Sequence, residues 1–240
     1  MKERSLTVAA RIKRNLMIMI ATLVIMLACA WFQYRNGLFT SVTMLIMVFL
    51  SGLVAFGFWE PIADILDPMF QNQALAGCED LIALMSLFCV TLLALRVAAI
   101  YLNPEMIDEH GALQHLGAMG VGLITGYFVA GFLICTMQTL PIEERFLDFE
   151  QRSSSEPAYR SFFPPDRVWL ALMRHAGASP FTWKEEPSPA GDTNLERYIT
   201  FDRSGTFELR YARYRRSNET RGPMPYLGEF DRDLSKQKPR

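Results

Sequence analysis

One arginine, Arg96, interrupts the apolar sequence LLALRVAAIYLNPE, which covers residues 92–105. A charged side chain at the centre of a membrane helix costs about 2.5–3.5 kcal/mol, so an arginine there needs a physical reason. It can line a path for an ion or substrate, tie two helices together, or reach the headgroups from near a helix end. Arg96 precedes Tyr101 by five residues, which is about 7.5 Å along a helix. We therefore expect an anchor or a tie at one end of a span, with a role in a polar pathway as the alternative.

The other residues that could do chemistry are poorly arranged for catalysis. A metal site could use His110 and His115, which lie close together in the sequence. Asp108 or Glu109 would supply a carboxylate ligand, but loop histidines are usually solvated, and we expect no metal and no cofactor. The serines at 153–155 have no base paired with them in the sequence. We predict that the chain is not an enzyme.

Residues 210–216 form a cluster of arginines and tyrosines. Such a mixture can bind nucleic acid or anionic lipid. We expect this cluster to face the negatively charged membrane surface, and we expect no nucleic-acid partner.

The charged residues are strongly segregated along the 240-residue chain. Of 24 lysines and arginines, five lie in residues 1–14 and 17 follow Met137, so only Arg35 and Arg96 fall between. That middle region contains four apolar runs, each close to the roughly 20 residues with which a helix crosses a bilayer. None has the polar stripe of a surface helix in a soluble protein. The predicted spans are residues 16–32, 37–58, 81–101 and 116–137.

These runs predict an all-α integral membrane protein in which residues 16–137 form a four-helix transmembrane bundle. The first two spans are joined by residues 33–36 alone, so we expect them to form an antiparallel hairpin. Ala28-Cys29-Ala30 also resembles the cleavage site of a signal peptide. Three further spans follow, and the first run is long for a signal core, so we favour an uncleaved helix.

The basic N-terminal segment, residues 1–15, predicts the orientation. Lysines and arginines flanking a first span are retained in the cytoplasm. Four spans return the chain to the same face, so both termini should be cytoplasmic.

The connection after the second span has two interpretations. In the segment GFWEPIADILDPMF, Pro61 suits the first turn of a helix, and apolar residues follow at helical spacing. The segment is either a helix on the membrane surface or an extension of the second span that passes Pro61.

The tail, residues 138–240, is expected to be a small cytoplasmic α+β region or to be partly disordered. Residues 165–176 predict a short helix that starts at a proline and stops before Gly177. Residues 196–214 predict a β-hairpin, because β-branched and aromatic residues flank a turn sequence. The apolar face of the short helix is predicted to hold Val168, Leu170, Ala171, Leu172 and Met173.

The fourth span carries small residues at a four-residue spacing. These residues should form a shallow groove in which another helix approaches closely. The sequence does not distinguish a second span of this chain from a second copy or another membrane protein as the partner. The predicted packing residues are Ala118, Gly122, Gly126 and Ala130.

Three short motifs resemble the bacterial colicin V production protein family over about residues 16–140. The turn after the first span, Arg35-Asn36-Gly37-Leu38-Phe39, is similar to the Arg-Gly-Phe-like turn of the family, with Asn36 inserted. The acidic start of the third span, Glu79-Asp80-Leu81, and the glycine-rich residues 116–126 also match. Members often have Arg-Gly in the last motif, where this chain has Thr125-Gly126. Within the turn, the residues that carry the resemblance are Arg35, Gly37 and Phe39.

The resemblance implies a compact bundle of about four spans in the bacterial inner membrane. It associates the chain with toxin biosynthesis, meaning production or secretion of a bacteriocin, or with envelope homeostasis, and it brings no catalytic residue. The expected partners are the lipid bilayer and either a second copy or a partner helix that meets the fourth span. The alternative is a small transporter or channel component with Arg96 in a polar pathway.

Overall fold

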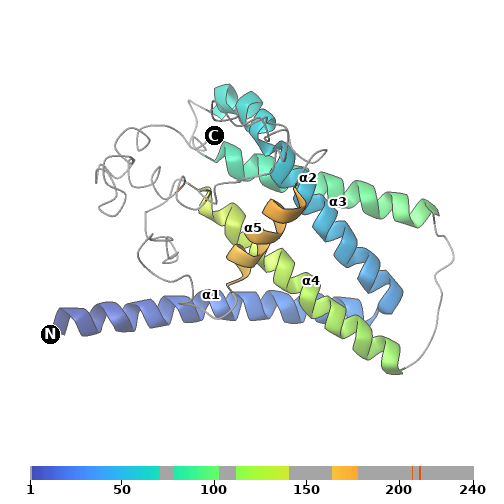
Figure 1. Cartoon of the computed structure of the whole chain (residues 1–240), viewed down its shortest axis with the longest axis horizontal. Coiled ribbons are helices and arrows are strands. Elements are labelled where there is room, and N and C mark those ends of the chain that lie inside the picture. Colours follow the sequence, from blue (N-terminus) through green and yellow to red (C-terminus); the bar gives the residue numbers. More distant parts are fainter. Residues whose placement is uncertain are drawn as a thin grey trace, which may run out of the picture.

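The computed structural model describes residues 2–70, 78–102, 112–140 and 164–177, together with Phe207 and Tyr211. This part of the chain is all-helical and contains no strand. Figure 1 shows the arrangement of its helices. They are α1 (Lys2–Tyr34), α2 (Leu38–Phe70), α3 (Glu79–Leu102), α4 (Ala112–Gln138) and α5 (Pro165–Ala176).

Two helices extend well beyond the apolar runs. Helix α1 begins at Lys2, so the basic N-terminal segment continues into the first apolar run without a break. Helix α2 passes both Pro61 and Pro68 before it ends at Phe70. The segment after the second apolar run is therefore an extension of that helix, and a separate surface helix is not formed. Each proline removes one backbone hydrogen bond, and the helix tolerates this loss near its end.

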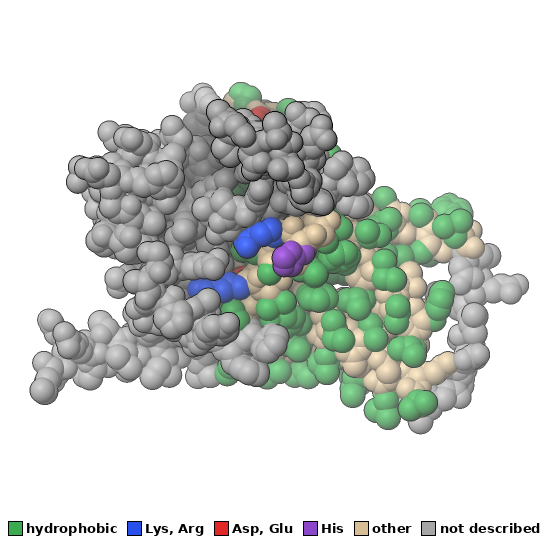
Figure 2. Space-filling model, in the orientation of Figure 1, with side chains coloured by type: hydrophobic (Ala, Val, Ile, Leu, Met, Phe, Trp, Pro, Cys, Tyr) green, Lys and Arg blue, Asp and Glu red, His purple; other side chains and the backbone are tan. Residues whose placement is uncertain are grey.

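Three of the helices are long and apolar enough to cross a membrane. The candidate spans are Leu38–Leu66, Glu79–Leu102 and Leu113–Gln138, and a shorter apolar helix covers Ile18–Tyr34. Hydrophobic side chains cover much of the described surface in Figure 2, including the exposed faces of these helices. Such a surface is unfavourable in water and favourable in hydrocarbon.

Helix α4 holds the helices together. Helix α1 packs mainly against α4, while α2 packs against both α3 and α4 (Figure 1). The short link between α1 and α2 reverses the chain, but the two helices then diverge and have little contact. The chain reverses at this link, as the predicted hairpin requires, but α4 rather than α2 is the helix that packs along α1.

The turn between α1 and α2 closes the end of α1 with backbone and side-chain hydrogen bonds. Gly37 has a φ of 80°, a conformation that other residues adopt only with strain. The backbone N–H of Asn36 donates to the carbonyl oxygen of Gln33 at 3.0 Å, and the Ser41 hydroxyl lies 3.4 Å from the same oxygen. The ring of His115 donates from Nδ1 to the carbonyl oxygen of Tyr34 at 2.9 Å. These bonds satisfy carbonyl groups that have no partner within the helix.

The groove of small residues on α4 holds α1 of the same chain. A methyl group added at Gly122 would lie 2.7 Å from the Cα of Ala30, and one added at Gly126 would lie 2.6 Å from the Cα of Met26. The two backbones therefore touch where α4 has no side chains. As residue numbers rise along α4 they fall along α1, so the helices are antiparallel. Ala118 and Ala130, which extend the same four-residue spacing, are fully buried.

We predict that Gly122→Ala and Gly126→Ala each destabilise the protein, because the new methyl group would overlap the backbone of α1. Overpacking of this kind typically costs about 1–3 kcal/mol. Unfolding of the purified protein in detergent, followed by circular dichroism, measures the effect. Gly120→Ala is the matched control, because a methyl group there meets no atom within 4 Å. Equal stability of all three variants would contradict close packing at this seam.

Candidate functional site

The tail helix α5 docks on the bundle at two glycines. A methyl group at Gly131 would lie 2.9 Å from the Cβ of Trp169 and closer still to the carbonyl oxygen of Pro165. A methyl group at Gly52 would overlap the indole ring of Trp169. Figure 1 shows α5 lying across α2 and α4, where these glycines are located. Because Gly52 and Gly131 have no side chains, they leave the space that Trp169 fills.

This docking site lies just inside one end of the predicted spans. Gly52 is six residues before the end of the run 37–58, and Gly131 is six residues before the end of the run 116–137. Six residues correspond to about 9 Å along a helix. The indole of Trp169 therefore packs near the ends of these two apolar runs, on the side of the bundle where α4 ends and α3 begins.

Aromatic rings from three spans and the tail meet at this end, in what we call the aromatic cluster. Phe132 of α4 stacks on Phe88 of α3 with ring centroids 4.0 Å apart, and it meets Phe56 of α2 edge-on at 6.0 Å. Phe56 also contacts Trp169 at 6.3 Å and Phe207 at 5.9 Å. Such pairs add to the stability gained from burial alone. The cluster consists of Phe56, Trp59, Phe88, Phe132, Trp169, Phe207 and Tyr211.

Two buried carboxylates lie beside the aromatic cluster. Glu79 and Asp80 form the first turn of α3, and each exposes only 2% of its surface. The hydroxyl group of Tyr211 donates to Oδ2 of Asp80 at 3.1 Å. The N-terminal end of a helix favours negative charge, which lowers the cost of burying these groups. Asp80 thus links the start of a predicted span to a residue far along the tail.

A third carboxylate, Asp166, fixes the start of α5 against the end of α4. The side-chain amide of Gln138 donates to Oδ2 of Asp166 at 3.0 Å, and the thiol of Cys135 lies 3.5 Å from the Asp166 carbonyl oxygen. Burial raises the pKa of Asp166 above its usual range, although Arg167 and the bond from Gln138 act in the opposite direction. The docked tail therefore favours the protonated carboxyl group.

The other predicted site residues lie elsewhere. Arg35 and Phe39 are exposed on either side of Gly37, at the opposite end of the bundle from α5. Arg96 is exposed in the last two turns of α3, where no described residue forms an ion pair or hydrogen bond with it. His115 caps α1, and the described residues include no group of three metal-ligating side chains. His110 lies outside the described residues. The structure thus separates the turn, Arg96 and the tail-docking site.

Two predictions for the tail were wrong. Trp169 was left out of the apolar face of α5, yet it is fully buried, whereas Ala171 is exposed. The four-residue spacing of Trp169 and Met173, both fully buried, was the available signal. Phe207 and Tyr211 were placed in a β-hairpin, but the backbone at both is helical. Their ring centroids lie 4.9 Å apart, and the rest of the predicted hairpin lies outside the described residues.

We predict that Trp169→Ala releases α5 and uncovers Cys135, whose side chain is completely buried next to Asp166. Truncating a buried tryptophan typically costs about 3–5 kcal/mol. In protein whose other three cysteines are alanine, Cys135 should react with a maleimide much faster after the substitution. His175→Ala, at an exposed position of the same helix, should leave the rate unchanged. Identical rates in both variants would show that α5 does not depend on Trp169.

The raised pKa of Asp166 predicts a pH dependence of stability. Below the pKa of the unfolded chain the carboxyl group is protonated in both states, so Asp166→Asn should match the parent protein. As pH rises through the raised pKa, the parent protein must bury a charge and loses stability, while the Asn variant does not. The gap between their unfolding temperatures should therefore widen with pH in favour of the variant. A gap that stays constant across the titration would contradict this assignment.

The comparison with known families covers the bundle but ends before α5. The family model described as colicin V production protein matches residues 18–159, which is more than half of the chain. No curated protein and no solved structure matches the chain significantly. The matched region includes the second half of α1 and all of α2, α3 and α4, together with the turn at Gly37 and the contacts of Gly122 and Gly126 with α1. The chain therefore belongs to the colicin V production protein family.

Proposed function

We propose that the chain is a non-enzymatic, multi-pass protein of the bacterial inner membrane that supports toxin production or secretion, or envelope homeostasis. It acts through contacts between helices and has both termini in the cytoplasm. The observation that carries this proposal is the family match over residues 18–159, which covers the four apolar helices.

The antiparallel packing of α1 and α4 supports the proposed orientation. Because Gly122 meets Ala30 and Gly126 meets Met26, the start of α1 and the end of α4 point the same way. The tail helix α5 docks at that end of α4. This arrangement supports placing the start of α1 and the docked α5 on one side of the membrane, as the basic residues at both ends of the chain predict for a cytoplasmic face.

A transporter with Arg96 in a polar pathway remains the second candidate function. A pathway residue would be expected to face other spans, because charged side chains in a membrane usually face the bundle interior. Arg96 is instead exposed, as are Leu93 and Val97 on the adjacent turns of α3. This position favours an interfacial anchor.

Complementation tests the proposed function. We expect the chain to restore secretion of colicin V in a producing strain that lacks its own colicin V production protein, measured as killing of a sensitive indicator strain. Detergent sensitivity of the same cells reports on the envelope. The control is Gly126→Leu, which should accumulate poorly and fail in proportion. No effect on secretion or on detergent sensitivity, from protein that accumulates normally, would refute the proposal.

The substitution Arg96→Gln separates the two candidate functions. We expect it to leave both secretion and protein accumulation close to the parent level. An arginine that only anchors a span end at the headgroups takes no part in transport, and glutamine can also lie at the interface. In sealed vesicles containing the purified protein, we expect no ion flux that depends on Arg96. A flux that the parent protein supports and the equally stable Gln variant lacks would favour the transporter.

A further inference from the structure

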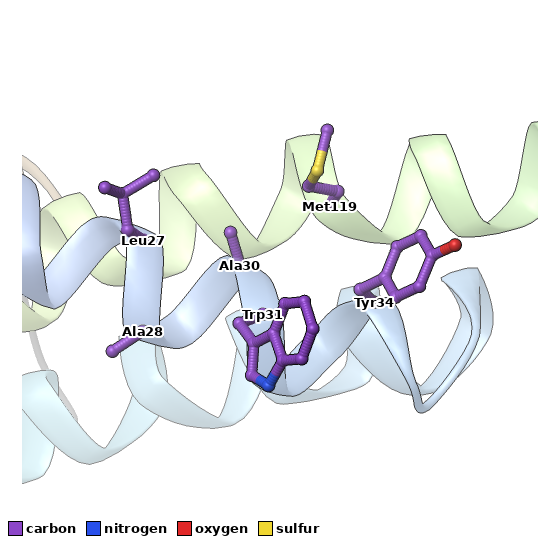
Figure 3. Close-up of a pocket in the computed structure, with 6 residues that line it drawn as sticks. All are labelled: Leu27, Ala28, Ala30, Trp31, Tyr34 and Met119. Atoms are coloured by element: carbon purple, nitrogen blue, oxygen red, sulfur yellow. The ribbon is translucent and has the colours of Figure 1, made fainter.

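An apolar pocket of about 530 Å³ lies on the outer surface of α1, where it borders α4. Figure 3 shows Leu27, Trp31 and Tyr34 on successive turns of α1, with Met119 extending from α4. Ala28 and Ala30 carry only methyl groups, which leaves a hollow between the larger side chains. Large side chains therefore surround small ones along a strip that opens sideways, away from the helix bundle.

The pocket runs from the headgroup level into the apolar layer. Tyr34 is the last residue of α1, and Leu27 precedes it by seven residues, or about 10 Å. Trp31 and Tyr34 are 71% and 41% exposed, as is usual for aromatic residues at the edge of a bilayer. In hydrocarbon a sideways-opening apolar hollow is in contact with lipid tails, and its elongated shape suits an acyl chain.

A basic residue follows the polar end of the pocket in the sequence. Arg35 follows Tyr34 directly and is exposed. His115 holds this end in place, because its ring donates to the Tyr34 carbonyl oxygen and lies 5.1 Å from the Tyr34 ring. Residues 27–41 and 113–122, which form this end of α1, α2 and α4, contain no aspartate or glutamate. A phosphate group beside Arg35 would therefore meet a cation and no opposing carboxylate from these segments.

We propose that this pocket binds one acyl chain of an anionic phospholipid, with the phosphate group beside Arg35. The proposal concerns a ligand site and goes beyond the function proposed above. Apolar burial against Leu27, Trp31 and Met119 holds the chain, and Arg35 selects the charge of the headgroup. One basic side chain near a membrane surface contributes about 1 kcal/mol, which corresponds to roughly a fivefold preference for the anionic lipid.

Native mass spectrometry of the full-length protein tests this site. The protein is released from nanodiscs of equimolar phosphatidylglycerol and phosphatidylcholine with identical acyl chains, and the lipids that stay bound are counted. We expect one retained lipid, with phosphatidylglycerol favoured about fivefold. Ala28→Phe should fill the pocket and remove that lipid. Ala21→Phe is the matched control, because Ala21 is exposed two turns earlier on the same side of α1 and does not line the pocket.

The charge assignment has its own pair of variants. Arg35→Gln should keep the bound lipid but lose the preference for phosphatidylglycerol, whereas Arg96→Gln should leave the preference intact. Ala28→Leu, a smaller filling group, should give an intermediate loss of lipid if Ala28→Phe unfolds the protein. Equal lipid counts in the parent protein and the filled variants would show annular lipid only and overturn the proposal. A lipid-free dimer that the filled variants abolish would overturn it in favour of a second copy.

Discussion

The structure depends on how closely other helices can approach α4, and glycine sets that distance on two of its sides. Gly122 and Gly126 admit the backbone of α1, and Gly131 admits the start of α5. Residues 126 and 131 are five positions apart, so they face different directions around the helix. Because dispersion forces fall steeply with separation, a side chain at these points would weaken all the contacts around it. Helix α4 can therefore hold both an early span and the tail without a gap.

Helix α3 is held very differently, and this explains its exposed half. It packs mainly against α2, and its first turns are also held by the stack of Phe88 on Phe132 and by the hydrogen bond between Asp80 and Tyr211. Beyond Phe88 the side chains are mostly exposed, and Val90 and Leu93 expose 65% and 63% of their surfaces. A helix anchored at one end leaves its other half to the lipid. Arg96 belongs to that half, so its long side chain has free space in which to reach the interface.

The sequence predicted where the long helices lie in the chain, but it did not predict which helices pack against each other. Runs of uncharged residues show where helices form in hydrocarbon, because the backbone must bond to itself there. They do not show which helices touch, so the sequence did not reveal that α4 packs along α1 or that Gly122 meets Ala30 there. Trp169 and Tyr211 were missed for a related reason. The burial of each depends on space formed by distant spans, which the tail sequence alone does not show.

The limits of the family match define what the tail can contribute. Phe56, Phe88 and Phe132 lie within the matched residues 18–159, whereas Trp169, Phe207 and Tyr211 lie beyond them. The family match therefore covers the bundle side of the aromatic cluster and not its tail side. The described tail residues contact the bundle on the side where α3 begins. Trp169 fills the space beside Gly52 and Gly131, and Tyr211 donates a hydrogen bond to Asp80. Among the described residues, this aromatic contact is where the tail joins three spans at once, so it is the place through which these residues can act on the bundle.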